Sequence, residues 1–282
     1  MTTPETQIEA AIRVYDARAD TYEQSWHPDY SRRFVALIPL RPGDRVLSLC
    51  CGTGLDVFLA AEAVGDTGKV VGVDISSGML GKANERKEKD AQLGPRTSFV
   101  RHSVTDLDSL VAPEVQKGTF DFIMCSNAFV LFDNPADVVR MWKDYLKPGG
   151  RLAIDITHEH NFRSGVVMER VAERMGVPFP ANRSWIKSKD SFREILEKEG
   201  CVVEAIHEIE KVSGERSKYY TLDQADEQYE YVANSIFTVP IFHGDFKERA
   251  RGVFKEEWAK TAVDGKVVVV DSLYLYIARK QE

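Results

Sequence analysis

Short apolar segments alternate with segments of helical periodicity through the first part of the chain. The apolar runs predict buried strands at 45–51, 69–74, 98–104, 120–129 and 151–157. The segments between them predict helices at 55–64, 76–90 and 136–146. Because strands and helices alternate in this way, we expect right-handed βαβ units and a mostly parallel sheet.

The pattern changes on either side of this alternation. Residues 5–27 have apolar positions at helical spacing and predict one amphipathic helix before the first strand. Beyond residue 161, strands are expected at 201–212 and 266–280, and helices at 163–176, 188–199, 222–237 and 245–262. The chain thus predicts an α/β fold with a Rossmann-like, seven-stranded, mostly parallel sheet, an antiparallel last strand and flanking helices.

Composition narrows the classes of partner. The formal net charge of −7 would repel phosphate backbones and argues against nucleic acid. No run approaches the ~20 apolar residues of a membrane span, and the first residues lack the apolar core of a signal peptide. The four cysteines form no paired C-x-x-C motifs, which argues against a disulfide scaffold or a zinc site. We therefore expect a cytoplasmic protein with a small-molecule partner, no nucleic acid and no membrane.

The turn after the first predicted strand is the main candidate for ligand binding. Gly52 and Gly54 lie between a strand and a helix, where glycine permits a tight turn and close approach of a ligand. Asp74 ends the next strand, and a carboxylate at that position can accept both hydroxyls of a ribose. Dinucleotides and S-adenosylmethionine are both bound by this layout, so the motif leaves two ligand classes.

Two residues of the following helix separate these ligand classes. A pyrophosphate on the helix N-terminus usually requires a third glycine, and Val57 stands at that position. Asp56, in the first helical turn, would repel a pyrophosphate. S-adenosylmethionine has no phosphate and has a cationic sulfonium, so these residues favour it as the cofactor.

Several segments together resemble the class I S-adenosylmethionine-dependent methyltransferases. They are, in order, RVLSLCCGTG, KVVGVDISSGML, SFVRHSV and YLKPGGRLAI. The opening segment YDARADTYEQS resembles the quinone-biosynthesis methyltransferases and their small-molecule relatives. The resemblance covers roughly residues 13–157. It implies transfer of a methyl group to an oxygen, nitrogen, sulfur or carbon nucleophile of a small molecule.

The resemblance also implies which residues contact the cofactor. Gly52 and Gly54 would line its methionine part, Asp74 would bind the ribose hydroxyls, and Tyr15 and Tyr22 would close over it. The full set of expected cofactor residues is Tyr15, Tyr22, Cys50, Gly52, Gly54, Asp74, Ile75, Met79, Ser103, Val104 and Asn127.

Three positions depart from the family pattern. Ser48 replaces an acid that helps to hold the cofactor's amino group, and Cys50 replaces the first glycine of the loop. Ser103 replaces an acid that reads the adenine amine, with Asp106 nearby as a substitute. These departures keep an alternative open, namely a protein of this fold that binds the cofactor without methyl transfer. A nicotinamide-dependent dehydrogenase is the other alternative.

Histidines and aromatic residues are the candidates for the acceptor side. His158 and His160 follow the fifth strand directly, and either could take a proton from the acceptor. This histidine pair has no third ligand in the sequence, so we expect no metal. The mixture of aromatic residues favours an apolar or aromatic acceptor. The expected acceptor-binding residues are Trp26, His27, Phe129 and His243.

The same considerations predict how the chain is organised. We expect a single class I methyltransferase domain over residues 1–282. Residues 1–40 would form an N-terminal helical cover and residues 41–160 the cofactor-binding core. Residues 161–282 would form the acceptor side, with a helical insertion at about 213–262 between the last two strands.

Overall fold

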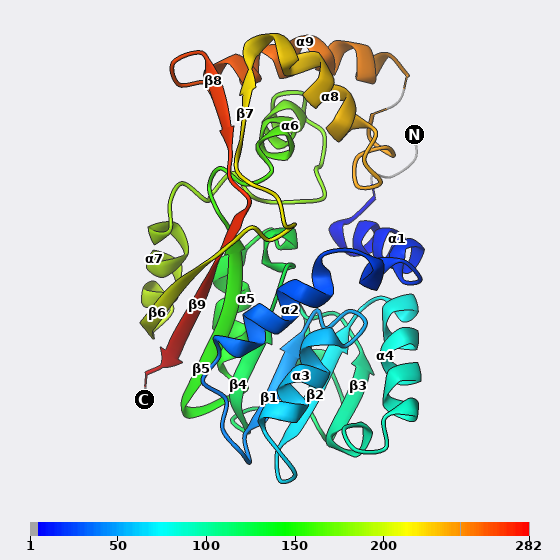
Figure 1. Cartoon of the computed structure of the whole chain (residues 1–282), viewed down its shortest axis with the longest axis vertical. Coiled ribbons are helices and arrows are strands. Elements are labelled where there is room, and N and C mark those ends of the chain that lie inside the picture. The colour runs from blue at the N-terminus through cyan, green and yellow to red at the C-terminus, as the bar shows by residue number, and fades with distance from the viewer. Residues whose placement is uncertain (1–4, 243, 282) are drawn as a thin grey trace.

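A seven-stranded sheet forms the centre of the computed structural model, which describes residues 5–242 and 244–281. The strand order is β3-β2-β1-β4-β5-β9-β6. β9 runs antiparallel to both β5 and β6, and the remaining neighbours from β3 to β5 pair in parallel. The predicted fold class is confirmed (Figure 1). The strands are β1 (Arg45–Leu49), β2 (Lys69–Asp74), β3 (Thr97–Arg101), β4 (Phe120–Cys125), β5 (Leu146–Thr157), β6 (Cys201–Glu210) and β9 (Ser272–Lys280).

Helices cover both faces of this sheet. Tyr30, Val57 and Leu80 of α2, α3 and α4 share one hydrophobic cluster with the strands. Trp142 of α5 and Phe192 of α7 belong to the cluster on the other face. Burial on both faces explains why the central strands read as continuous apolar runs. These helices are α2 (His27–Ala36), α3 (Leu55–Ala63), α4 (Ser77–Lys89), α5 (Pro135–Lys143) and α7 (Asp190–Lys198).

A second, smaller layer of structure lies beyond the carboxyl ends of the parallel strands (Figure 1). We call it the cap. Val171, Phe254 and Trp258 are buried in its own hydrophobic cluster, separate from the two clusters of the sheet. The cap comprises α6 (Arg163–Arg174), α8 (Ala225–Ala233) and α9 (Gly244–Lys260), with the two-stranded antiparallel sheet of β7 (Lys218–Thr221) and β8 (Lys266–Val269).

Besides β7, a strand inside the expected helical insertion, two elements differ from the sequence prediction. The single helix expected over 5–27 is instead α1 (Gln7–Arg18), a short 3-10 turn, and α2. Pro28 stands in the first turn of α2, where its missing N–H costs nothing, so the break has a local cause. The strand expected over 266–280 is divided into β8 and β9, because its first part pairs with β7. None of the described helices has both the length and the hydropathy of a membrane span.

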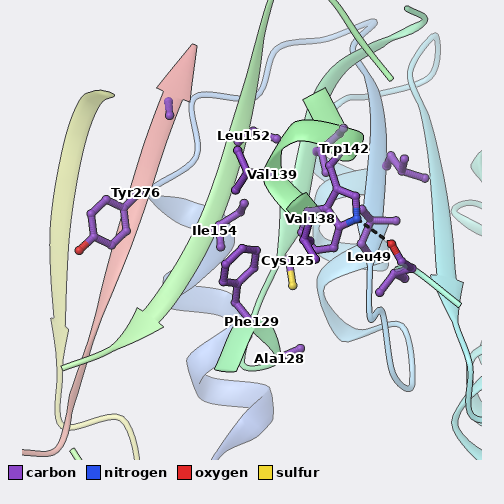
Figure 2. Packing of buried hydrophobic residues seen from close by; sticks show 14 of the residues in the cluster. Leu49, Cys125, Ala128, Phe129, Val138, Val139, Trp142, Leu152, Ile154 and Tyr276 are labelled. Carbon is purple, nitrogen blue, oxygen red and sulfur yellow. Dashed lines mark hydrogen bonds between the residues drawn. The ribbon is translucent and has the colours of Figure 1, made fainter. Parts of the chain in front are cut away.

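Side-chain hydrogen bonds fix the elements that surround the carboxyl ends of the strands. Ser76 caps α4 by accepting from the backbone N–H of Met79 at 3.1 Å. Asp16 of α1 accepts from the backbone N–H of Gly78 at 2.9 Å, which ties the N-terminal helix to the same turn. The indole of Trp142 donates to the carbonyl of Val104 at 2.8 Å, as Figure 2 shows with a dashed line. These bonds hold the loops in which the predicted cofactor residues lie.

Candidate functional site

Two cavities open at the carboxyl ends of the strands. The first, of about 600 Å³, lies between α1 and the ends of β1, β2 and β4. The second, of about 710 Å³, lies between the ends of β4 and β5 and the cap. The two cavities share Tyr15, Asn127 and Ala128 in their linings. Both fall within the ordinary size range of small-molecule sites, roughly 300–1,000 Å³.

The first cavity collects the residues that the resemblance assigned to the cofactor. Ten of the eleven expected positions line it, all except Gly54. A Cβ on Gly54 would lie 3.1 Å from the ring of Phe99, and the residue has φ +82. Gly54 therefore serves the packing of the turn behind the cavity. Contact of the other ten with a cofactor stays a prediction.

The glycine turn presents open backbone to the first cavity. Gly52 has φ +54, and a Cβ built on it would meet no atom within 4 Å. A side chain here would project into free space that a ligand could otherwise fill. Cys50, in place of the family's glycine, has φ 55 and keeps the left-handed backbone conformation. The turn therefore keeps its backbone geometry although Cys50 replaces the glycine of the family pattern.

Asp74 is held at the end of β2 by backbone groups. Its side chain is 8% exposed, and burial is the main reason why its pKa is raised. Oδ2 accepts from the N–H of Gly52 at 2.8 Å and Oδ1 from the N–H of Ser76 at 2.9 Å. Each carboxylate oxygen keeps a further lone pair that can accept a hydroxyl.

The charges around the first cavity suit a cationic ligand. Four carboxylates line it, and no lysine, arginine or histidine is among its described lining residues. Asp108 and Asp137 form ion pairs with Lys117 and Arg140 outside the lining, so the negative charge of the cavity comes mainly from the other two. This acidic lining would repel a pyrophosphate and attract a sulfonium or an ammonium group. The residues present therefore fit S-adenosylmethionine better than a dinucleotide. The four carboxylates are those of Asp74, Asp108, Asp133 and Asp137.

The second cavity contains three of the four expected acceptor residues, Trp26, His27 and Phe129. The Trp26 and His27 rings are stacked with centroids 4.0 Å apart. His27 is 6% exposed, and burial lowers its pKa to about 4, so its imidazole is neutral at pH 7. His243, the fourth expected residue, lies outside the described residues.

His158 and His160 line neither cavity. Side chains alternate along β5, so Asp155 and Thr157 face the second cavity, whereas His158 continues the opposite face. His158 stacks on Tyr274, with centroids 5.1 Å apart, and its Nδ1 accepts from the N–H of His160 at 3.0 Å. Among the described residues, no group of three or more potential ligands is placed to hold a metal.

Asp155 is a site residue that the sequence analysis did not single out. It is 2% exposed, and burial raises its pKa to about 7. Oδ2 accepts from the Tyr30 hydroxyl at 2.5 Å and Oδ1 from the N–H of Asn127 at 2.8 Å. The signal available in the sequence was a lone acid inside the apolar strand RLAIDIT. A carboxyl with a pKa near neutrality beside a cavity is suited to proton transfer.

Comparisons with known proteins agree with this geometry. Residues 46–150 match the family model of a methyltransferase domain. A demethylmenaquinone methyltransferase of Symbiobacterium thermophilum is 32% identical over 162 residues, which cover 52% of this chain and 59% of that protein. A nocamycin O-methyltransferase of Saccharothrix syringae is 32% identical over 144 residues, which cover 50% of this chain and 49% of that protein.

The similarity in structure extends further along the chain than the similarity in sequence. The crystal structure of the [4+2]-cyclase SpnF has a TM-score of 0.60 at 14% identity and covers 100% of this chain and 98% of that one. At this identity the likeness shows the fold alone. The chain spans about half to three fifths of the length of the two curated relatives. The match of residues 46–150 to the methyltransferase-domain model thus falls on the part of the chain that holds the glycine turn and β1 to β4 of the sheet.

Proposed function

We propose that the protein transfers the methyl group of S-adenosylmethionine to an O, N, S or C nucleophile of a small molecule bound in the second cavity. The observation that carries this proposal is the wall shared by the two cavities, formed by Tyr15, Asn127 and Ala128. Methyl transfer is an in-line displacement, and its main requirement is that donor and acceptor meet at a fixed geometry without water. Two adjoining cavities that share lining residues support such an arrangement.

The first cavity would hold the cofactor. When bound, S-adenosylmethionine supplies a methyl group on a sulfonium that leaves readily. Asp74 would accept the ribose hydroxyls, and the open backbone at Gly52 would allow the methionine part to approach. Tyr15 and Tyr22 of the N-terminal segment would exclude water. Their rings lie edge to face with centroids 6.5 Å apart.

The second cavity would hold the acceptor. Trp26, His27 and Phe129 would contact its apolar part, and Asp155, which lines the same cavity, would take a proton from a nucleophile that arrives protonated. His158 remains a second candidate for that role. All four cysteines are free, which supports the further proposal of a cytoplasmic location.

Calorimetry with S-adenosylmethionine, S-adenosylhomocysteine and NADH in turn tests the cofactor. We expect the first two to bind and NADH not to bind. Asp74→Ala should weaken S-adenosylhomocysteine binding by about 1–3 kcal/mol, because buried hydroxyls would lose a charged acceptor. The matched control is Asp245→Ala on α9, which removes an exposed carboxylate away from both cavities.

Transfer itself is tested with methyl-labelled S-adenosylmethionine and a panel of small aromatic phenols, acids, amines and thiols. Label in at least one acceptor, lost in Asp74→Ala, would support the proposal. Tight S-adenosylhomocysteine binding without transfer to any acceptor would instead indicate a cofactor-binding protein without transferase activity. Binding of NADH alone would contradict the assignment of the first cavity.

A further inference from the structure

The second cavity differs from the first in the charge of its lining. Five basic side chains line it, contributed by α1, α6, β7 and the loops between elements. No basic side chain lines the first cavity within the described residues. Among charged side chains, the first cavity is therefore lined by carboxylates alone, whereas the second is lined by both basic and acidic groups. The five basic residues are Arg18, Arg163, Arg183, Arg216 and Lys218.

The four carboxylates that line the second cavity are engaged elsewhere. Glu215 forms an ion pair with Lys218, and Asp271 accepts from the N–H and hydroxyl of Ser213, both at 2.9 Å. Glu227 accepts from Gln224 at 3.4 Å. The fourth, Asp155, accepts from Tyr30 and Asn127. The arginines of the cavity lack a direct ion-pair partner: within the described chain, no carboxylate forms a salt bridge with the guanidinium of Arg18, Arg163 or Arg183.

Arg183 shows this lack of an ion-pair partner most clearly. Its guanidinium lies over the ring of Phe162, 5.5 Å from the centroid, and its Nε is buried without a hydrogen-bond partner. Burial is the main reason why the pKa of Arg183 is lowered. The charge of Glu169 opposes this shift. Its carboxylate accepts hydrogen bonds not from the guanidinium but from the backbone N–H of Arg183, at 2.8 and 3.1 Å, and from that of Ser184, at 2.9 Å.

Arg163 is in a similar position. Its Nε is also buried without a partner, and its terminal nitrogen contacts the ring of His160, which is not an anion. Burial lowers the pKa of this guanidinium, the neighbouring Arg170 acts in the same direction, and the charge of Glu159 opposes both without forming a salt bridge. A guanidinium removed from water without an anionic partner destabilises the protein, and a bound anion would offset that cost.

We propose that the acceptor bears an oxyanion group, a carboxylate or a phosphate, that binds to Arg183 and Arg163 in the second cavity. This inference rests on the proposed function and specifies its substrate class. The planar guanidinium fork matches either oxyanion with two parallel hydrogen bonds. Trp26 and Phe129 line the same cavity, so the rest of the acceptor is apolar or aromatic. Arg183 and Tyr15 both line the second cavity, and Tyr15 also lines the first, so the anchor lies in the cavity that adjoins the cofactor.

The test compares 1-naphthoate, 1-naphthyl phosphate and the neutral 1-naphthamide by calorimetry on the protein saturated with S-adenosylhomocysteine. We expect at least one of the two anions to bind roughly 10- to 100-fold more tightly than the amide, as for a charge-assisted pair. Which anion binds more tightly identifies the oxyanion. Arg183→Gln should reduce its affinity to that of the amide, whereas Arg183→Lys should keep part of the preference.

Two controls keep the result interpretable. Arg32→Gln removes an exposed arginine of α2 that lines neither cavity and should leave all affinities unchanged. S-adenosylhomocysteine binding reports folding of each variant, because Arg183 does not line the first cavity. If Arg183→Gln does not fold, Arg163→Gln should show the same loss of preference.

The proposal is overturned if the amide binds as well as both anions, if none of the three binds, or if the folded variants keep the full preference. These titrations involve no methyl transfer. If the protein transfers no methyl group, the titrations can still show a preference for the anion, and only the proposed function fails. If it methylates neutral acceptors alone, the proposed function stands and this inference is overturned.

Discussion

The backbone N–H of Asn127 donates a hydrogen bond of 2.8 Å to Oδ1 of Asp155, and this bond joins the ends of β4 and β5. Asn127 has φ 54, a left-handed conformation that asparagine tolerates better than most residues. Asn127 lines both cavities and Asp155 lines the second. The lining that the two cavities share thus includes a residue in a backbone conformation that most side chains disfavour.

Substitution of Asn127 separates its backbone role from its side-chain role. Asn127→Gly keeps the left-handed conformation without strain, whereas Asn127→Ala must adopt it with a Cβ. We expect the alanine variant to be about 1 kcal/mol less stable than the glycine variant. Urea unfolding of both variants measures the difference at equal m-values. Equal midpoints would show that this conformation is not required in the folded protein.

Gly52→Ala should affect the cofactor more than the fold. Its methyl group would project into the first cavity, where no protein atom lies within 4 Å. We expect at least a tenfold loss of S-adenosylhomocysteine affinity, about 1.4 kcal/mol or more. The matched control is Gly118→Ala. Gly118 has φ +70 and open space around its Cβ position, but it lines neither cavity.

Both glycine variants add a Cβ to a left-handed residue, so both should lose a similar, small amount of stability. Calorimetry then separates the two positions, since only Gly52→Ala should bind S-adenosylhomocysteine more weakly. A similar loss of affinity in Gly118→Ala would mean that general destabilisation, rather than contact with the cofactor, explains the result.

Local sequence signals predicted the first cavity much better than the second. Asp74 ends β2 and Gly52 lies three residues after β1, so their position follows from the strands themselves. Arg163 and Arg183 reach the second cavity only because the cap and its adjoining loop fold over β5, and no periodicity encodes that placement. His158 was chosen for its nearness to the strand end, but alternation along β5 directs it to the opposite face.

Asp155 should make stability fall as pH rises. Its pKa is about 7 in the folded protein and 3.8 in a model peptide. Between these values the folded state holds a proton that the unfolded state has released, so the free energy of unfolding decreases with rising pH and levels off above about 7. Asp155→Asn should remove this decrease. The free energy of unfolding of the variant, relative to that of wild type, should therefore rise by about 1.4 kcal/mol per pH unit between the two pKa values, a few kcal/mol in all.

His27 should have the opposite effect on the pH dependence of stability. Its pKa is about 4 when folded and 6.5 in a model peptide, so the unfolded state binds the extra proton between these values. Wild-type stability therefore gains a contribution from His27 as pH rises from about 4 to 6.5, and His27→Gln should remove it. Urea unfolding at pH 4, 5, 6, 7 and 8 measures both variants. Parallel pH profiles for wild type and Asp155→Asn would show that this carboxyl does not hold its proton in the folded protein.

The final prediction concerns the group that accepts a proton during transfer. Asp155 lines the second cavity with a pKa of about 7, whereas His158 lines neither cavity and its Nδ1 already accepts a backbone N–H. For an acceptor that binds protonated, Asp155→Asn should lower the single-turnover rate by roughly 10²- to 10⁴-fold. His158→Gln, which keeps one hydrogen-bonding group, should transfer at nearly the wild-type rate.

The pH profile distinguishes a base from a positioning residue. In wild type the single-turnover rate should rise with pH through about 7 and then become constant, because only the ionised carboxylate of Asp155 can take the proton. Asp155→Asn should lose this inflection, and an acceptor that binds already deprotonated should react at similar rates in both proteins. If the inflection persists in Asp155→Asn and disappears in His158→Gln, the histidine is the base, and the acceptor must then reach the face of β5 on which Tyr274 packs.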